Sequence, residues 1–167
     1  MKWLLFLTIP LFLLDQITKN AIVRRFSDES YLSREWIEVI PGFFNLVRVH
    51  NRGMAFGLLG ASSLANVLFL GIACAAIVLL TVLWRRGAFP TRMSQIAVAL
   101  LLSGIFGNVY DRLTRGYVVD FLDFNLGFMR WPSFNVADSC ICVAAGLLMI
   151  SSFRDEREAN QRAAEHA

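Results

Sequence analysis

Four long apolar stretches constrain the fold of this chain more than any other feature. They run over about residues 3–23, 64–84, 94–113 and 134–153. A helix needs about 20 apolar residues to cross a hydrocarbon core of about 30 Å. With 56% hydrophobic and 17% charged residues, the chain is also too apolar for a soluble globular protein, in which about a quarter of the residues are charged. The sequence therefore predicts four membrane-spanning helices.

The length of 167 residues favours a single integral membrane domain over 1–167. The apolar run after Lys2 could be mistaken for a cleaved signal peptide. It has no small-residue cleavage site, however, so we expect a retained first span. Four spans place the insertions of about 24–63 and 114–133 on one face, with both termini and the charged tail 154–167 on the other. Arginines flank the spans on both sides, so charge alone does not decide which face is cytoplasmic.

The insertions contain extended segments. Trp36–Ile40 and Phe43–His50 are rich in β-branched and aromatic residues and flank the turn signal Pro41-Gly42. A further extended segment covers Tyr117–Arg130. The predicted fold class is a membrane all-α bundle of four transmembrane helices with a small β-containing insertion and loops on one face.

Two aspartates stand out as candidates for chemistry. Asp120 is enclosed by apolar neighbours, and Asp138 lies at the mouth of the fourth span, three residues after Asn135 on the same helix face. Two carboxylates in a poorly solvated site cannot both ionise cheaply, so one keeps a proton and the pair can activate water. Two alternatives stay open at this point. Asn135 and Asp138 have the spacing of a helix capping box, and Asp120 could be a surface carboxylate at a strand edge.

Two spans carry polar groups that are expensive at membrane depth. The first contains a carboxylate and a lysine four residues apart, which could simply pair. The third has a stripe on which glycine would allow a neighbouring helix to approach closely, and on which polar side chains could bind a peptide or a lipid headgroup. These residues are Asp15 and Lys19 in the first span, and Gly104, Asn108, Asp111 and Arg112 in the third.

Five short motifs follow one another along the chain. They are Asp15–Lys19 (D-Q-x-[ST]-K), Asn51–Phe56 (N-x-G-x-A-F), Gly104–Arg112 (G-x-x-G-N-x-x-D-R), and Val118–Phe121 and Phe134–Asp138 around the two aspartates. In this order they resemble the motifs of the lipoprotein signal peptidase family (signal peptidase II). One departure is Ser103, where family members often have a second glycine; serine is small enough to keep the packing close.

The resemblance implies an aspartyl endopeptidase that cuts the signal peptide of a prolipoprotein just before a cysteine carrying diacylglycerol. It makes Asp120 and Asp138 the catalytic pair. It also implies a set of residues that support the site or contact substrate or the cyclic peptide antibiotic globomycin. They are Asp15, Lys19, Asn51, Gly53, Gly104, Asn108, Asp111, Arg112 and Asn135.

The resemblance also implies a location. The chain would be a multi-pass protein of the bacterial inner membrane, with cytoplasmic termini and periplasmic insertions. Its partners would be prolipoproteins and membrane lipids, without nucleic acid, and it would act as a monomer. With two histidines and no HExxH or CxxC motif, we expect no metal and no cofactor.

Other classes of membrane protein fit the sequence less well. A presenilin-like protease would have glycines before Asp120, a zinc protease would have HExxH, and a rhomboid would have a serine motif with a histidine in a span. A proton-coupled transporter would keep its carboxylates in mid-bilayer, whereas Asp120 and Asp138 lie beside extramembrane segments. A plain anchoring protein would explain none of the motifs.

Overall fold

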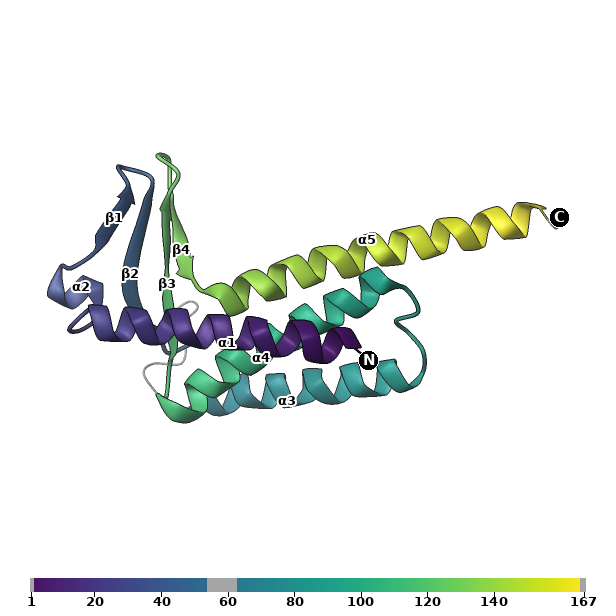
Figure 1. The fold of residues 1–167 in the computed structure, drawn as a ribbon, viewed down its shortest axis with the longest axis horizontal. Helices are drawn as coiled ribbons and strands as arrows, with labels where there is room; N and C mark the ends of the chain where they lie inside the picture. Colours follow the sequence, from purple (N-terminus) through teal and green to yellow (C-terminus); the bar gives the residue numbers. More distant parts are fainter. Residues whose placement is uncertain (1, 54–62, 166–167) are drawn as a thin grey trace.

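The structure, a computed structural model, describes residues 2–53 and 63–165 (Figure 1). Met54–Phe56, the second half of the second motif, lie outside the described residues.

Among the described residues, four long helices form the bundle, and each contains a segment long and apolar enough to cross a membrane. The prediction of four spans is confirmed, with boundaries moved by a few residues. The third helix begins at Arg92, because the Thr91 side chain caps it by accepting a hydrogen bond from the Ser94 N–H (3.1 Å). The helices are α1 (Lys2–Arg25), α3 (Ser63–Arg85), α4 (Arg92–Thr114) and α5 (Val136–Glu165).

Helix α4 lies at the centre of the bundle and packs against both α1 and α5 (Figure 1). Glycines permit the close approach: a Cβ at Gly107 would lie 2.6 Å from Asp15 Oδ2 and 3.0 Å from the Ala137 Cβ. The close helix packing predicted at the glycines of this helix is therefore confirmed. Helix α3 packs against α4 around Leu80 and Val98 but is otherwise largely exposed, as expected of a lipid-facing helix.

The two insertions join in one antiparallel sheet with the strand order β1-β2-β3-β4. The first two strands agree with the prediction. Two elements were not predicted: the single-turn helix α2 (Ser30–Ser33), which is too short for helical periodicity, and β4, an edge strand that tolerates Pro132. The strands are β1 (Ile37–Ile40), β2 (Phe44–Asn51), β3 (Val118–Asn125) and β4 (Arg130–Phe134).

The sheet stands at one end of the bundle, where α1 and α4 end and α5 begins (Figure 1). Ile22 and Phe26 at the end of α1 are buried against Val119 and Phe121 of β3. This apolar contact fixes β3 on the bundle and leaves Asp120, between those two residues, directed the other way along the alternating strand.

Candidate active site

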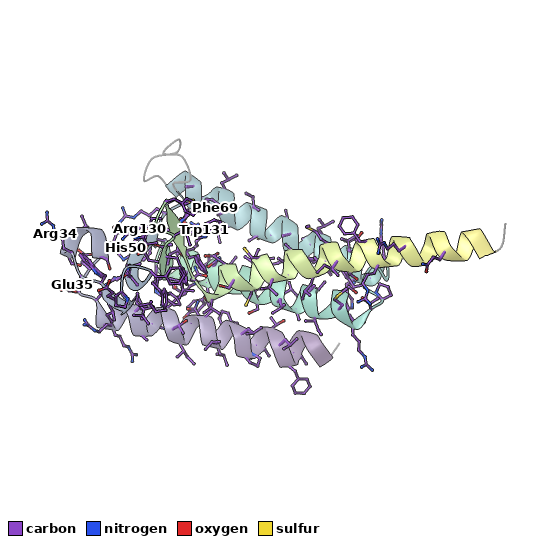
Figure 2. The ribbon with its side chains drawn as sticks, turned by 90° about the horizontal axis from the view of Figure 1, so that it is seen from above. Arg34, Glu35, His50, Phe69, Arg130 and Trp131 are labelled. Atoms are coloured by element: carbon purple, nitrogen blue, oxygen red, sulfur yellow. The ribbon has the colours of Figure 1, made fainter. Side chains whose placement is uncertain are left out.

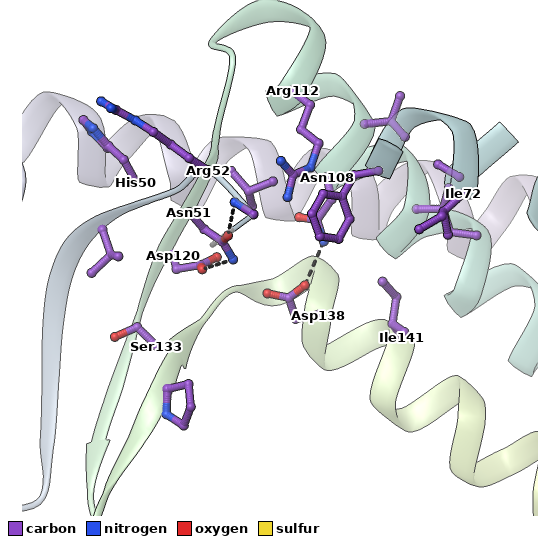
Figure 3. A pocket seen from close by; sticks show the side chains of 18 of the residues that line it. His50, Asn51, Arg52, Ile72, Asn108, Arg112, Asp120, Ser133, Asp138 and Ile141 are labelled. Carbon is purple, nitrogen blue, oxygen red and sulfur yellow. Dashed lines mark hydrogen bonds between the residues drawn. The ribbon is translucent and has the colours of Figure 1, made fainter. Parts of the chain in front are cut away.

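A cavity of about 800 Å³ lies where the sheet meets α3, α4 and α5 (Figure 3). One end is polar and the other is lined by apolar side chains of the helices. Asp120 and Asp138 enter it from β3 and α5. Of the predicted site residues, the cavity brings together Asn51, Gly53, Asn108, Arg112, Asp120 and Asp138.

Asp120 lies on an interior strand and is only 2% exposed. Its Oδ2 accepts a hydrogen bond from Asn51 Nδ2 (2.9 Å), and its Oδ1 accepts one from Asn135 Nδ2 (2.7 Å). The alternative of a surface carboxylate at a strand edge is therefore wrong. Both oxygens of Asp120 have amide donors, which hold the side chain in one orientation.

Asp138 lies in the first turn of α5 and has two sets of partners. Asn135 Oδ1 accepts from the Asp138 N–H (2.9 Å), and Asp138 Oδ2 accepts from the Asn135 N–H (3.3 Å). The capping box considered from the spacing is therefore present. Asp138 Oδ1 accepts from Asn108 Nδ2 (2.7 Å) at the cavity. The cap uses only Oδ2, so Oδ1 stays available on the cavity side.

Burial raises the pKa of Asp120 to about 7, and the negative charge of Asp138 adds to the effect. The hydrogen bonds from Asn51 and Asn135 act in the opposite direction because they favour the ionised form. The site therefore retains a proton near neutral pH, the condition that a pair of carboxylates needs for acid–base chemistry.

Arg112 reaches the cavity from α4 and is held by α3. Its Nη1 donates to Asn66 Oδ1 (2.9 Å), and its guanidinium lies 4.3 Å from the ring centroid of Phe69. Phe69 lies on the part of α3 nearest the sheet (Figure 2). Sequence reasoning missed Asn66 and Phe69, because they belong to an apolar run in which no spacing distinguishes them.

A buried ionic group lies behind the cavity. Lys19 Nζ is 2.9 Å from Asp15 Oδ2, so the pairing considered for α1 is present. It is also 3.1 Å from Asp111 Oδ2 on α4, a contact that the sequence did not predict. Asp111 also pairs with Arg115. Gly104 lies at the contact between α4 and α5, against the Ala137 carbonyl.

His50 lines the cavity, although no role in the site was predicted for it from the sequence. Its Nδ1 is 2.7 Å from Glu29 Oε1, its Nε2 accepts from Arg48 Nε (3.1 Å), and its ring stacks on Tyr117 at 3.9 Å. Burial lowers the pKa of His50. Because Nε2 accepts from Arg48, a neutral imidazole carries its hydrogen on Nδ1 and donates it to Glu29. His50 thereby links β2 to the residue before α2 and to the residue before β3.

The fold and the site define a class: a multi-pass membrane protein that brings two carboxylates into one cavity at one end of its bundle. The profile of the family described as "Signal peptidase (SPase) II" matches residues 7–154. The chain belongs to the signal peptidase II family, and the resemblance inferred from the five motifs is confirmed.

Individual relatives and solved structures agree. The chain is 40% identical over 160 residues to the lipoprotein signal peptidase of Vibrio cholerae, which covers 95% of this chain and 91% of the relative. It is 45% identical over 147 residues to that of Ralstonia nicotianae, covering 87% and 80%. A bacterial membrane enzyme solved by the in meso method at 1.9 Å superposes with a TM-score of 0.81 and 29% identity, covering 93% of this chain and 95% of the other.

Proposed function

We propose that this chain is the aspartic endopeptidase that removes the signal peptide from diacylglyceryl-modified prolipoproteins, just before the lipidated cysteine. Membership of the signal peptidase II family and the names of its relatives support cleavage of prolipoproteins in lipoprotein maturation. The observation that carries the proposal is the entry of Asp120 and Asp138 into one cavity.

Asp120 and Asp138 are the proposed catalytic pair and share one proton. The ionised carboxylate takes a proton from a water molecule as that water attacks the scissile carbonyl. The protonated carboxylate donates its proton as the amine leaves. The raised pKa of Asp120 supports this sharing, and because the two carboxylates interact, the proton belongs to the pair as a unit. Peptide hydrolysis on this route uses the two carboxylates and water.

The two ends of the cavity match the two parts of such a substrate. The apolar wall, with Ile72 of α3, Ile105 of α4 and Ile141 of α5, suits a signal-peptide helix and acyl chains. The scissile peptide then reaches the carboxylates at the polar end, where Arg112 can donate to a substrate carbonyl. Asn51, Asn108 and Asn135 act as supports that orient the carboxylates.

The proposal extends to inhibitors, assembly and location. A cyclic peptide such as globomycin would compete for the same cavity, since its backbone carbonyl groups are the same hydrogen-bond acceptors as those of the substrate peptide. We further propose that the enzyme acts as a monomer. We place it in the bacterial inner membrane, with both termini cytoplasmic and the sheet at the periplasmic surface.

A cleavage assay tests the proposal. Purified protein in detergent is incubated with a diacylglyceryl-modified prolipoprotein and, separately, with the unlipidated form, and the product is separated on a gel. We expect the wild type to cleave the lipidated form, and Asp120→Asn and Asp138→Asn each to lose all detectable cleavage.

Asp123→Asn is the matched control, since Asp123 is a buried carboxylate of the same strand that does not line this cavity in the described residues. It should cleave normally. Turnover by either Asp120→Asn or Asp138→Asn would refute the catalytic pair, and a folded wild type without activity on the lipidated substrate would refute the function.

A further inference from the structure

The buried ion pairs behind the cavity converge on one atom, the Nζ of Lys19. Its three acceptors are Asp15 Oδ2 at 2.9 Å, Asp111 Oδ2 at 3.1 Å and Asn108 Oδ1 at 3.0 Å. A lysine ammonium has three hydrogens, so these three acceptors satisfy it. Lys19 is fully buried and is not among the described residues that line the cavity.

The two carboxylates that Lys19 contacts each hold the backbone just before one aspartate of the proposed pair. Asp15 Oδ1 accepts from the N–H of Ala137 (2.9 Å), and Asp111 Oδ2 accepts from the N–H of Val119 (3.0 Å). Ala137 precedes Asp138 and Val119 precedes Asp120. Through these contacts a single ammonium group connects α1 and α4 to the start of α5 and to β3.

The third contact of Lys19 determines which way the Asn108 amide faces. Because Lys19 donates to Asn108 Oδ1, the amide nitrogen is left to donate to Asp138 Oδ1 (2.7 Å). Asn135 Nδ2 donates to the same Asn108 oxygen at 3.3 Å and to Asp120 Oδ1 at 2.7 Å. Reversal of the Asn108 amide would place its oxygen against the Asp138 carboxylate, so the orientation imposed by Lys19 keeps a donor at that position.

Apolar packing would hold these helices together without buried charges, which are costly to remove from water. The ionic group holds two backbone amides and one side-chain amide in addition to its own charges. From this geometry we infer that Lys19 is a positioning residue for cleavage, which sets the relative placement of the Asp120 and Asp138 carboxylates without contacting substrate. The inference rests on the proposed function of that pair.

The experiment compares three variants in the prolipoprotein cleavage assay. Lys19→Met removes all three donors but leaves one buried carboxylate without a compensating charge. Lys19→Met combined with Asp15→Asn restores the balance of charge with Asp111 and Arg115. Thr18→Val is the matched control on α1, since the Thr18 hydroxyl bonds to carbonyls of its own helix.

The charge-balanced double variant should melt near the wild-type Tm, with kcat lower by at least about 100-fold, the size expected for misplaced catalytic groups. KM should stay within about threefold, since Lys19 does not line the cavity. In Lys19→Met alone, loss of the Lys19 charge, which lowers the pKa of Asp120, should move the alkaline fall of kcat/KM to higher pH. The Asp138 and Arg112 charges, which also act near Asp120, are unchanged in this variant.

A double variant with wild-type kcat would overturn the inference, because neutralising Asp15 would then be the whole role of Lys19. If the double variant does not fold, Lys19→Gln, whose amide has donors for only two of the three acceptors, is measured instead, and a wild-type kcat in that variant overturns the inference. Wild type and Thr18→Val distinguish the two proposals. If both cleave the substrate and the Lys19 variants do so with the wild-type kcat, only the inference about Lys19 is refuted. A folded wild type that does not cleave refutes the proposed function.

Discussion

At the scale of single residues, the site is built from carboxylates whose partners are asparagine side chains on other elements. Asp120 is held by Asn51 of β2 and by Asn135 at the start of α5, and Asp138 by Asn108 of α4. An asparagine donates without carrying a charge. It therefore fixes a carboxylate while lowering its pKa less than a lysine or arginine at the same distance would.

The pH dependence of cleavage should report the hydrogen bond from Asn51. Activity requires one proton on the pair, so kcat/KM should fall as the pH rises through about 7, the pKa of Asp120. The Asn51 hydrogen bond lowers that pKa, so Asn51→Ala should raise it and move the alkaline fall to higher pH. Asn125→Ala, at the far end of β3, is the control. A profile with the same alkaline limb in Asn51→Ala would contradict the role of this bond.

Arg112 should contribute to substrate binding. Its guanidinium is presented to the cavity by Phe69 and Asn66, and a charged hydrogen bond to a substrate carbonyl is worth about 1.5–3 kcal/mol. Arg112→Ala should therefore raise KM by roughly tenfold or more, measured in the cleavage assay. Arg86→Ala, an exposed arginine after α3, is the control. An unchanged KM in Arg112→Ala would remove Arg112 from the binding site.

At the scale of elements, close contact of α1, α4 and α5 decides where the polar groups meet. Gly107 of α4 faces both Asp15 of α1 and Ala137 of α5. The absence of a side chain there allows Asp15 to reach the backbone N–H of Ala137. The position of Asp138, one residue later, thus depends on helix packing as well as on its own cap.

Substitution of Gly107 by alanine should separate these helices. The added Cβ would lie 2.6 Å from Asp15 Oδ2, so Gly107→Ala should lower the free energy of unfolding by about 1–3 kcal/mol, as overpacking does. Gly146→Ala on α5 is the matched control, since no atom lies within 4 Å of its added Cβ. Thermal unfolding in detergent measures both. Equal Tm values for the two variants would show that the contact at Gly107 is not tight.

At the scale of the whole molecule, the sheet and the polar ends of the helices lie at the same end of the bundle (Figure 1). The loop between α3 and α4 and the far end of α5 lie at the other. This arrangement places the proposed chemistry at one membrane surface, with the apolar wall of the cavity extending along the spans. A lipid-modified substrate can then keep its acyl chains in the bilayer while its peptide reaches water.

The proposed orientation can be measured by labelling single cysteines. In a variant with Cys74, Cys140 and Cys142 replaced by alanine, Phe128→Cys marks the exposed turn between β3 and β4, and Arg86→Cys marks the loop after α3. In cells with a permeabilised outer membrane, an impermeant maleimide should label Phe128→Cys alone. Arg86→Cys should react after the inner membrane is opened. The reverse pattern would overturn the orientation.

Much of this protein follows from its sequence because the relevant signals are local. A span is determined by some 20 consecutive apolar residues, and the turn at Pro41-Gly42 with its flanking residues is enough to predict β1 and β2. The spacing of Asn135 and Asp138 likewise predicted a cap that is present. The five motifs identified the family, and they contain most of the polar residues that line the cavity.

Tertiary structure alone decided which distant residues meet. The pairing of β2 with β3, the placement of Phe69 beneath Arg112, and the contacts of Lys19 with Asp111 and Asn108 join positions far apart in the chain. Such contacts leave no period or spacing in one sequence, because they arise when helices and strands pack. The sequence therefore determined the spans, the first strands and the candidate carboxylates, while packing decided how those carboxylates are held.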